Sequence, residues 1–428
     1  MKHARHSDLL RNTDLRVVPY RQLLAASTAL VVAGLATHPA VAADPIKLEL
    51  RGFWNSYILL GKIGRDVVGT TGTSYRPEAF RYEGEVWFTG STKLDNGTTV
   101  GIRIELEGWS NNTGISATTP SGTIDQIDEE YIFAFGDWGR IEFGATDAAS
   151  YKTQTASPSV MPGWGFQDQT WTNKGTGFTA ANNGGRVGTT TGMSASLAAN
   201  SGDANKFTYL TPRFAGLQLG LSYTPSFSGQ AVTATCPFRP GGANFNNCPR
   251  NNNAWHNGID ISANYANKFG DLSVKVSGGY MTAGFDRGTS GPTGIADNTG
   301  ARWKSWAAGA QLAYAGFTLG GGLGRDNNGL RGDNATRWYT AALMFESGRW
   351  MMSAGWWGGR NNDGNATVPT AQNAPGKDKM NMFEVGTTYA LSPGIRLVGG
   401  LNYVMGSGQS KSEKADSWAV ILGTALTF

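Results

Sequence analysis

The sequence has little charge, no long apolar run after residue 42, and one histidine, His256, beyond that point. Charged residues make up 16% of the 428 residues, whereas soluble proteins usually carry about a quarter. The missing apolar runs exclude membrane-spanning helices, which need about 20 apolar residues. No glycine-rich phosphate loop is present, and the sequence shows no evident acidic residue that would orient the imidazole ring of His256 for catalysis. We therefore expect no enzyme and no cofactor, and the absence of a Cys/His ligand spacing predicts no metal site.

The first 42 residues have the features of a secretory signal. Basic residues precede an apolar run at residues 23–35, and the small residues Ala40 and Ala42 supply a cleavage pattern. The run is too short to anchor the chain in a bilayer of about 30 Å. We predict a signal peptide at residues 1–42 and a mature barrel domain at residues 43–428. The mature part is close to neutral, so nothing indicates nucleic-acid binding.

Export places the two cysteines, Cys236 and Cys248, in an oxidising compartment. They lie close together in one Gly- and Asn-rich stretch, so we expect a disulfide between them. Two free thiols are the alternative.

Apolar and polar residues alternate along the rest of the chain, as at residues 46–51, 100–107 and 418–428. Seven short turns with Gly, Asn or Asp alternate with eight long polar stretches, and sixteen strands therefore follow. Alternation of short turns and long loops with an even strand count is typical of outer-membrane barrels. The fold class predicted is all-β, a 16-stranded antiparallel transmembrane β-barrel with both termini on the periplasmic side. Aromatic residues beside the short turns predict an interfacial girdle.

A soluble β-sandwich or β-solenoid would show the same alternation. A single sandwich rarely needs sixteen long strands, and no fixed short repeat indicates a solenoid. A barrel is favoured because, in lipid, only helices and closed barrels satisfy every backbone group. Sixteen strands enclose too wide a space for side chains to fill, so we expect an aqueous channel.

Three segments carry a resemblance to a known family: residues 48–53, residues 128–144, and the last strand, which ends in Thr427 and Phe428. They resemble the sixteen-stranded general porins of Gram-negative bacteria, of the alphaproteobacterial type, and the resemblance covers the whole mature chain. It implies an outer-membrane homotrimer in contact with lipid and lipopolysaccharide, and a long third loop, residues 148–205, folded into the barrel. The C-terminal Phe428 strand resembles the signal that the barrel-assembly machinery reads. Residues 162–166 lack the acid of the corresponding element in enteric porins.

The charged residues at inward positions concentrate in the first five expected strands. We predict a basic wall opposed by an acid on the third loop. The basic wall comprises Arg51, Arg81, Arg103 and Arg140; the acid is Asp168; acids on the same strands include Glu83, Glu85 and Glu105. Alternatively, these residues form salt bridges in the wall and have no effect on selectivity. We expect weak ion selectivity at most, of either sign.

The function predicted is an outer-membrane porin for passive diffusion of ions and small hydrophilic solutes. Two alternatives stay open. One is a substrate-specific channel with a binding ladder. The other is a surface receptor or adhesin whose long loops bind a partner.

Overall fold

The computed structural model describes residues 45–63, 77–107, 127–155, 157–161, 201–227, 255–285, 302–327, 329, 335–363, 376–407 and 414–428. The chain divides into two units, Met1–Asp44 and Pro45–Phe428. All described residues belong to the second unit. None of the helices in these ranges is long and apolar enough to cross a membrane.

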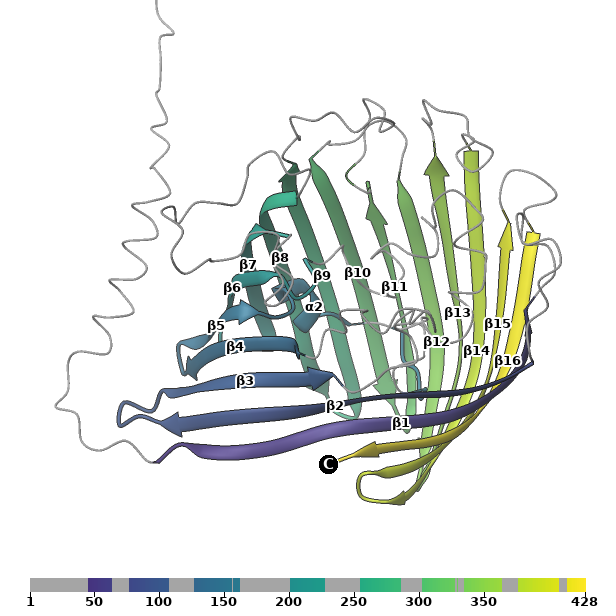
Figure 1. The fold of residues 1–428 in the computed structure, drawn as a ribbon, viewed down its shortest axis with the longest axis horizontal. Helices are drawn as coiled ribbons and strands as arrows, with labels where there is room; N and C mark the ends of the chain where they lie inside the picture. Colours follow the sequence, from purple (N-terminus) through teal and green to yellow (C-terminus); the bar gives the residue numbers. More distant parts are fainter. Residues whose placement is uncertain are drawn as a thin grey trace, which may run out of the picture. The chain divides into compact units, whose positions relative to one another are not determined.

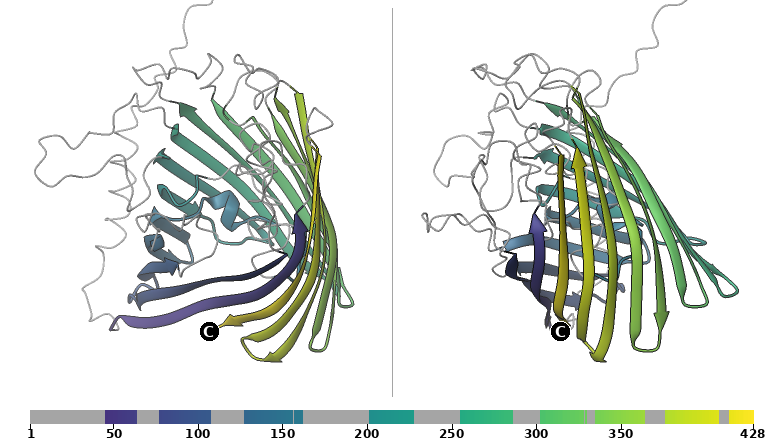
Figure 2. Two further views of the ribbon diagram at one scale, coloured as in Figure 1. Left: turned by 45° about the vertical axis from the view of Figure 1, so that its right-hand side comes forward. Right: turned by 90° about the vertical axis from the view of Figure 1, so that its right-hand side faces the viewer.

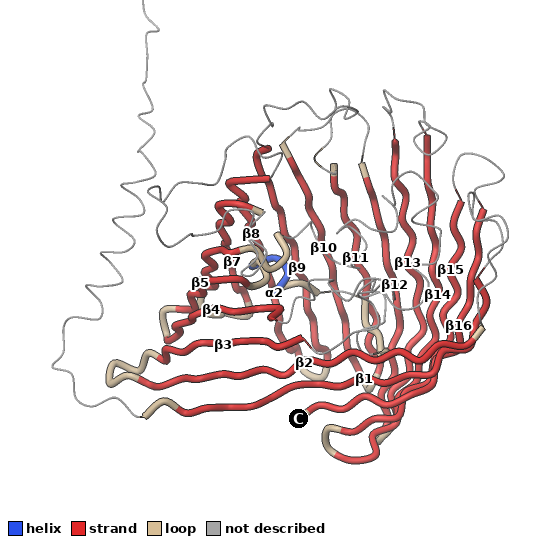
Figure 3. Tube along the Cα trace, in the orientation of Figure 1, coloured by secondary structure: helices blue, strands red, loops and turns tan. Residues whose placement is uncertain are grey.

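Sixteen antiparallel strands close into a barrel, with β1 paired to β16 (Figures 1 and 3). The strands are β1 (Lys47–Ile63), β2 (Glu78–Lys93), β3 (Thr99–Glu107), β4 (Ile127–Gly136), β5 (Gly139–Ala145), β6 (Asn205–Leu210), β7 (Leu217–Ser226), β8 (Trp255–Phe269), β9 (Leu272–Phe285), β10 (Trp303–Tyr314), β11 (Phe317–Asp326), β12 (Thr336–Ser347), β13 (Trp350–Asp363), β14 (Gly376–Ser392), β15 (Ile395–Ser407) and β16 (Lys414–Thr427). Every strand pairs with its neighbour in sequence, and a short helix, α2 (Ala149–Lys152), follows β5. The predicted sixteen-stranded antiparallel barrel is confirmed.

The alternation places apolar side chains on the outer face of the wall. On β1, Leu50, Trp54 and Ile58 are exposed, whereas Asn55 and Tyr57, of opposite parity, are buried. Successive side chains of a strand point to opposite faces. Because the exposed set is apolar, it suits lipid, and the polar set faces the interior of the barrel.

Tight turns join the strands where the sequence predicted them. Ala215 and Gly216 have φ of 47° and 90°, and Ala315 and Gly316 have φ of 50° and 83°. Two consecutive residues with positive φ make the type I′ turn, whose twist matches that of paired strands.

Exposed and half-buried aromatic residues cluster beside the short turns. The rings of Phe317 and Phe345 pack at a tilt with centroids 4.4 Å apart, and those of Trp350 and Tyr389 with centroids 4.7 Å apart. This is the arrangement expected of an interfacial girdle.

The strands differ in length around the barrel. Strands β5 and β6 have only 7 and 6 residues, whereas β1 and β14 each have 17. Figure 2 shows the long strands on one side of the barrel and the short ones on the other. The wall is therefore low at β5 and β6.

Candidate functional site: the charged inner wall

The predicted charged residues of β2, β3 and β5 lie on the inner face. On β2, exposed Phe80 and Phe88 have the opposite parity to Glu83 and Glu85. On β3, exposed Ile102 and Leu106 alternate with Arg103 and Glu105. On β5, Phe143 is 65% exposed beside the inward pair Arg140 and Glu142. Arg81 lies on β2, but its side chain is outside the described residues, as is the whole of Asp168.

Three of the predicted arginines are paired with an acid two positions away on their own strand. Arg51 Nη2 lies 3.0 Å from Glu49 Oε2. Arg140 Nε lies 2.6 Å from Glu142 Oε1, and Arg103 Nε contacts Glu105 Oε1 in the same way. Residues two apart on a strand share a face, so each pair is internal to the wall. The structure thus brings Arg51, Arg103 and Arg140 together with acids of their own strands.

Aromatic rings hold two of these guanidinium groups against the wall. Arg103 Cζ lies 4.5 Å from the centroid of Trp87, and Arg140 Cζ lies 4.7 Å from that of Phe133. The Trp87 indole in turn donates to Glu85 Oε2 at 2.8 Å. Such cation–π contacts add about 0.5–2 kcal/mol each. These rings were not predicted from the sequence, although their inward parity could have indicated them.

Lys152 on α2 connects the charged wall to the segment after β5. Its Nζ lies 2.8 Å from Glu142 Oε2 and donates to Thr146 Oγ1 at 2.7 Å. Burial lowers the pKa of Lys152, but Glu142, Glu129 and the Tyr131 phenol together outweigh burial and raise the pKa above its usual value. Lys152 therefore stays charged and anchors α2.

Two groups of acids crowd the same region. Carboxylate oxygens of Glu129, Asp147 and Asp203 lie within 4.8 Å of one another, as do those of Glu85, Glu105 and Asp128. Asp147 also donates its backbone N–H to Glu129 Oε1 at 2.9 Å. Oxygen donors of this kind suit hard cations, but exposed acids often group without one, and we assign no metal.

Burial, and then the nearby carboxylates of Asp203 and Glu129, raise the pKa of Asp147 to about 8. Near neutral pH this carboxyl group is therefore largely protonated.

Residues 149–155 are hydrogen-bonded to the inner face of β7, β8 and β9. Ser150 donates its backbone N–H to Asp260 Oδ1 at 2.8 Å, and its hydroxyl contacts Asp260 Oδ2. The backbone N–H of Ala149 donates to Ser222 Oγ at 2.8 Å, and that of Thr155 to Ser277 Oγ at 2.7 Å. Figure 1 shows α2 beside β8 and β9.

The segment continues along the wall to β14. Ser157 and Thr340 share a hydrogen bond of 2.6 Å, and the backbone N–H of Val160 donates to Ser353 Oγ at 3.1 Å. Ser159 Oγ donates to the buried Glu384 Oε1 at 2.6 Å. The first part of the predicted third loop therefore follows the inner wall strand by strand. Residues 162–200 of that loop lie outside the described residues.

Inward glycines make room for this segment. A Cβ on Gly309 would lie 1.9 Å from the carbonyl oxygen of Thr155, and one on Gly386 would lie 2.8 Å from Met161 Cγ. Met161 packs in an apolar cluster from β1, β15 and β16 that includes Tyr57 and Ile421. This apolar patch inside the barrel was not predicted from the sequence. Its signal is a run of apolar residues on both faces of β1 and β16.

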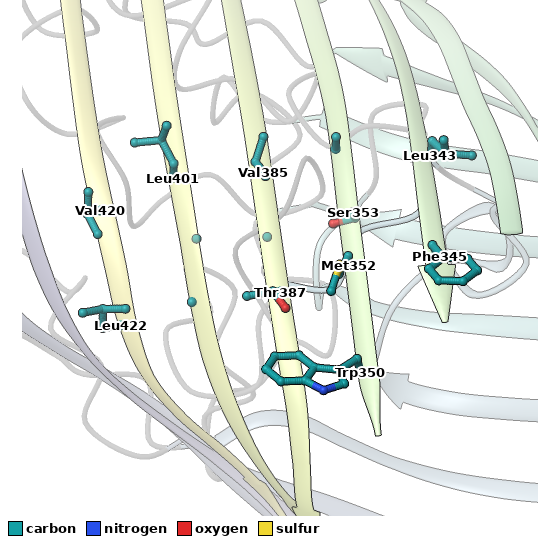
Figure 4. A pocket seen from close by; sticks show the side chains of 14 residues that line it. Leu343, Phe345, Trp350, Met352, Ser353, Val385, Thr387, Leu401, Val420 and Leu422 are labelled. Carbon is teal, nitrogen blue, oxygen red and sulfur yellow. The ribbon is translucent and has the colours of Figure 1, made fainter. Parts of the chain in front are cut away.

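A separate apolar hollow of about 850 Å³ lies over β12–β16. Its side chains include Leu343, Met352, Val385 and Leu401 (Figure 4), all of which are exposed on the outer face. This hollow is therefore on the lipid-facing surface and is not the path of a solute.

The sequence matches the Gram-negative porin family over residues 26–409. The chain belongs to this family. The porin fold is also that of an anion-selective porin from Comamonas acidovorans, with a TM-score of 0.53 and 14% identity over 90% of this chain and 100% of that one. A loop-deletion form of OmpT, an outer-membrane protein of Vibrio cholerae, has a TM-score of 0.52 and 12% identity over 90% and 100% of the two chains. No curated protein sequence matches this porin.

Family and barrel together make the protein an outer-membrane channel for passive diffusion of solutes. Both features are those of a channel and not of an enzyme. Cys236 and Cys248 lie outside the described residues, so their disulfide stays a prediction.

Proposed function

We propose that this porin is a general diffusion pore whose width and field are set by residues 146–161 and the charged wall of β2–β5. The observation that carries the proposal is the segment hydrogen-bonded around the inside of a sixteen-stranded barrel. Barrels of this size hold a water column that side chains alone do not fill. A segment attached to the inner wall narrows that column without closing it.

We further propose that the rest of the third loop continues into the lumen and brings Asp168 opposite the arginines. The support is the direction of the chain, since residues 149–161 already follow the inner face. Arg51, Arg81, Arg103 and Arg140, with Glu83, Glu85 and Glu105, would then act on passing ions through the field of the wall.

The low wall supports a homotrimer. A strand rises about 3.3 Å per residue and tilts by about 40° in such barrels, so the 7 residues of β5 cover only about 18 Å. The apolar band of an outer-membrane barrel is about 25 Å tall. Phe143 on β5 and Phe207 on β6 are nevertheless exposed. Neighbouring copies of the chain would cover this low wall, and the higher wall would contact lipid and lipopolysaccharide.

The chain ends support a periplasmic location for both termini. Phe428 pairs with Gly52 through two backbone hydrogen bonds of 3.0 Å, and an even strand count places both ends on one side. We propose that residues 1–42 are removed as a signal peptide. The exposed aromatic Phe428 would serve the barrel-assembly machinery.

We place the Cys236–Cys248 disulfide in an extracellular loop. The short loop that it closes limits its stabilisation to about 3 kcal/mol. Alkylation and mass measurement of the exported protein should find no free thiol, and two alkylated cysteines would refute the bond.

One observation favours the substrate-specific alternative. Trp255 and Trp303 lie with ring centroids 5.2 Å apart and pack against Met281 on the inner face of β9. The Trp303 indole donates to Asp326 Oδ1 at 2.7 Å. Aromatic rings next to polar groups can stack with sugar rings, as a binding ladder requires.

Liposome swelling distinguishes the two functions. A general pore should admit sugars at rates that fall smoothly with size and do not saturate. An entry rate that saturates for one sugar, and no longer saturates in a Trp303→Ala variant, would show a substrate-specific channel and not a general pore. Exclusion of all sugars by a correctly inserted protein would favour the receptor.

A further inference from the structure

Carboxyl groups outnumber basic groups on the inner wall of β2–β6 and the segment attached to it. The described acids there are Glu83, Glu85, Glu105, Glu107, Asp128, Glu129, Glu142, Asp147 and Asp203, and the described bases are Lys93, Arg103, Arg140, Lys152 and Lys206. With Asp147 protonated and Arg81 added from its strand position, acids still outnumber bases by eight to six.

Four of these bases are held close to wall oxygens. Arg103 and Arg140 are each paired within their own strand, and Lys152 shares Glu142 with Arg140. Lys206 Nζ donates to three backbone carbonyls, two of them, of Gly202 and Ala204, at 2.7 Å. These contacts fix the positive charges against the wall, where paired acids offset them.

The opposite wall does not compensate. Among its described residues, the inward charged side chains of β7–β16 are Asp260, Lys268, Lys275, Asp326, Glu346, Glu384 and Arg396. Acids again outnumber bases. With Lys47, Glu49 and Arg51 of β1 added, the described lumen still holds more acids than bases, although the mature chain as a whole is close to neutral.

We propose that this pore prefers cations to anions, with the carboxylates of β2–β4 as the residues that set the preference. The inference rests on the proposed diffusion function and names the solutes that it favours: inorganic cations and small cationic or dipolar molecules. A low-dielectric wall of one sign concentrates counter-ions in the water column. The described wall charges therefore favour cations, whereas the Comamonas acidovorans porin is anion-selective. The two proteins are alike in fold alone, so they need not share an ion preference.

The test is the reversal potential of the purified full-length porin in a planar bilayer under a KCl gradient near 0.1 M. We expect a ratio of potassium to chloride permeability above about 3. An electrostatic energy of only about half of RT per unit charge already enriches potassium and depletes chloride in the pore, and the two effects multiply to a ratio of about 3. In 1 M salt, where the Debye length is about 3 Å, the ratio should fall toward 1.

Two variants should move the ratio in opposite directions. Glu83→Gln, Glu85→Gln and Glu107→Gln together should bring it to about 1, and Arg103→Gln should raise it. The matched control neutralises three exposed acids at the short turns, Asp95→Asn, Asp137→Asn and Asp271→Asn. It should leave the ratio within about 20% of the wild type, because these groups lie in exposed turns at the strand ends, where salt screens their charge.

The outcomes separate the two proposals. A wild-type ratio at or below 1 in an open channel overturns the cation preference and leaves the diffusion pore intact. Equal ratios in the triple glutamine variant and the wild type assign the preference to other residues and overturn the role of β2–β4. A folded porin without conductance overturns the diffusion pore itself.

Discussion

The attachment of residues 149–155 to the wall predicts a specific effect of Asp260→Ala. The Asp260 side chain is only 4% exposed and accepts two hydrogen bonds from Ser150. Each charge-assisted bond contributes about 1.5–3 kcal/mol, so losing both destabilises the attached state by about 3 kcal/mol or more. That energy is a factor of about 100 in the population of the detached segment.

Detachment can move the segment only into the water column, because it already lies flat on the wall. We therefore expect a lower mean single-channel conductance with flickering, recorded in a planar bilayer. The melting temperature of the heat-modifiable barrel should stay within a few degrees, since the strand ladder is not touched.

Two further variants make this test decisive. Asp260→Asn keeps an oxygen acceptor for the Ser150 N–H and should show a smaller effect. Asp271→Ala, in an exposed turn, should show none. A steady, wild-type conductance in Asp260→Ala would mean that these hydrogen bonds do not hold the segment, and the reasoning would be wrong.

Further predictions concern the space, charge and protonation of the pore. Gly309→Leu should cause flickering because its Cβ would meet Thr155 O at 1.9 Å, whereas Gly278→Leu, with its nearest atom at 3.8 Å, should conduct normally. Replacing Arg51, Arg81 and Arg103 by Gln should enlarge the conductance and shift the reversal potential toward cations, and an unchanged potential at low salt would place these side chains away from the constriction. Raising the pH from 6 to 9 ionises Asp147, whose pKa is about 8, so the cation preference should increase with pH. The charged groups that face Asp147 are Glu129, Asp203, Lys152 and Lys206. The Asp147→Asn variant should lose the part of the increase that Asp147 causes. An identical pH profile in the variant and the wild type would refute the assignment.

The architecture was predictable because it depends on local patterns. Alternation of apolar and polar residues sets the face of each strand, and a one-residue error would expose every charge to lipid. Turn residues such as Ala315 and Gly316 mark the strand ends through their positive φ. Both signals act over a few residues and need no tertiary information.

The site was less predictable because it depends on which side chains meet. The inward position of Arg103 followed from parity, but its pairing with Glu105 and its contact with Trp87 are choices of side-chain rotamer. The partners of Ser150 and Ser159, Asp260 and Glu384, lie 110 and 225 residues away in sequence. No periodicity encodes such contacts.

The most direct test of the account is single-channel recording of the mature porin in a planar bilayer. We expect stepwise, ohmic conductance that rises almost in proportion to salt concentration, as a water-filled pore requires. A heat-modifiable, correctly inserted barrel that gives no steps, or whose current saturates at low salt, would contradict the account.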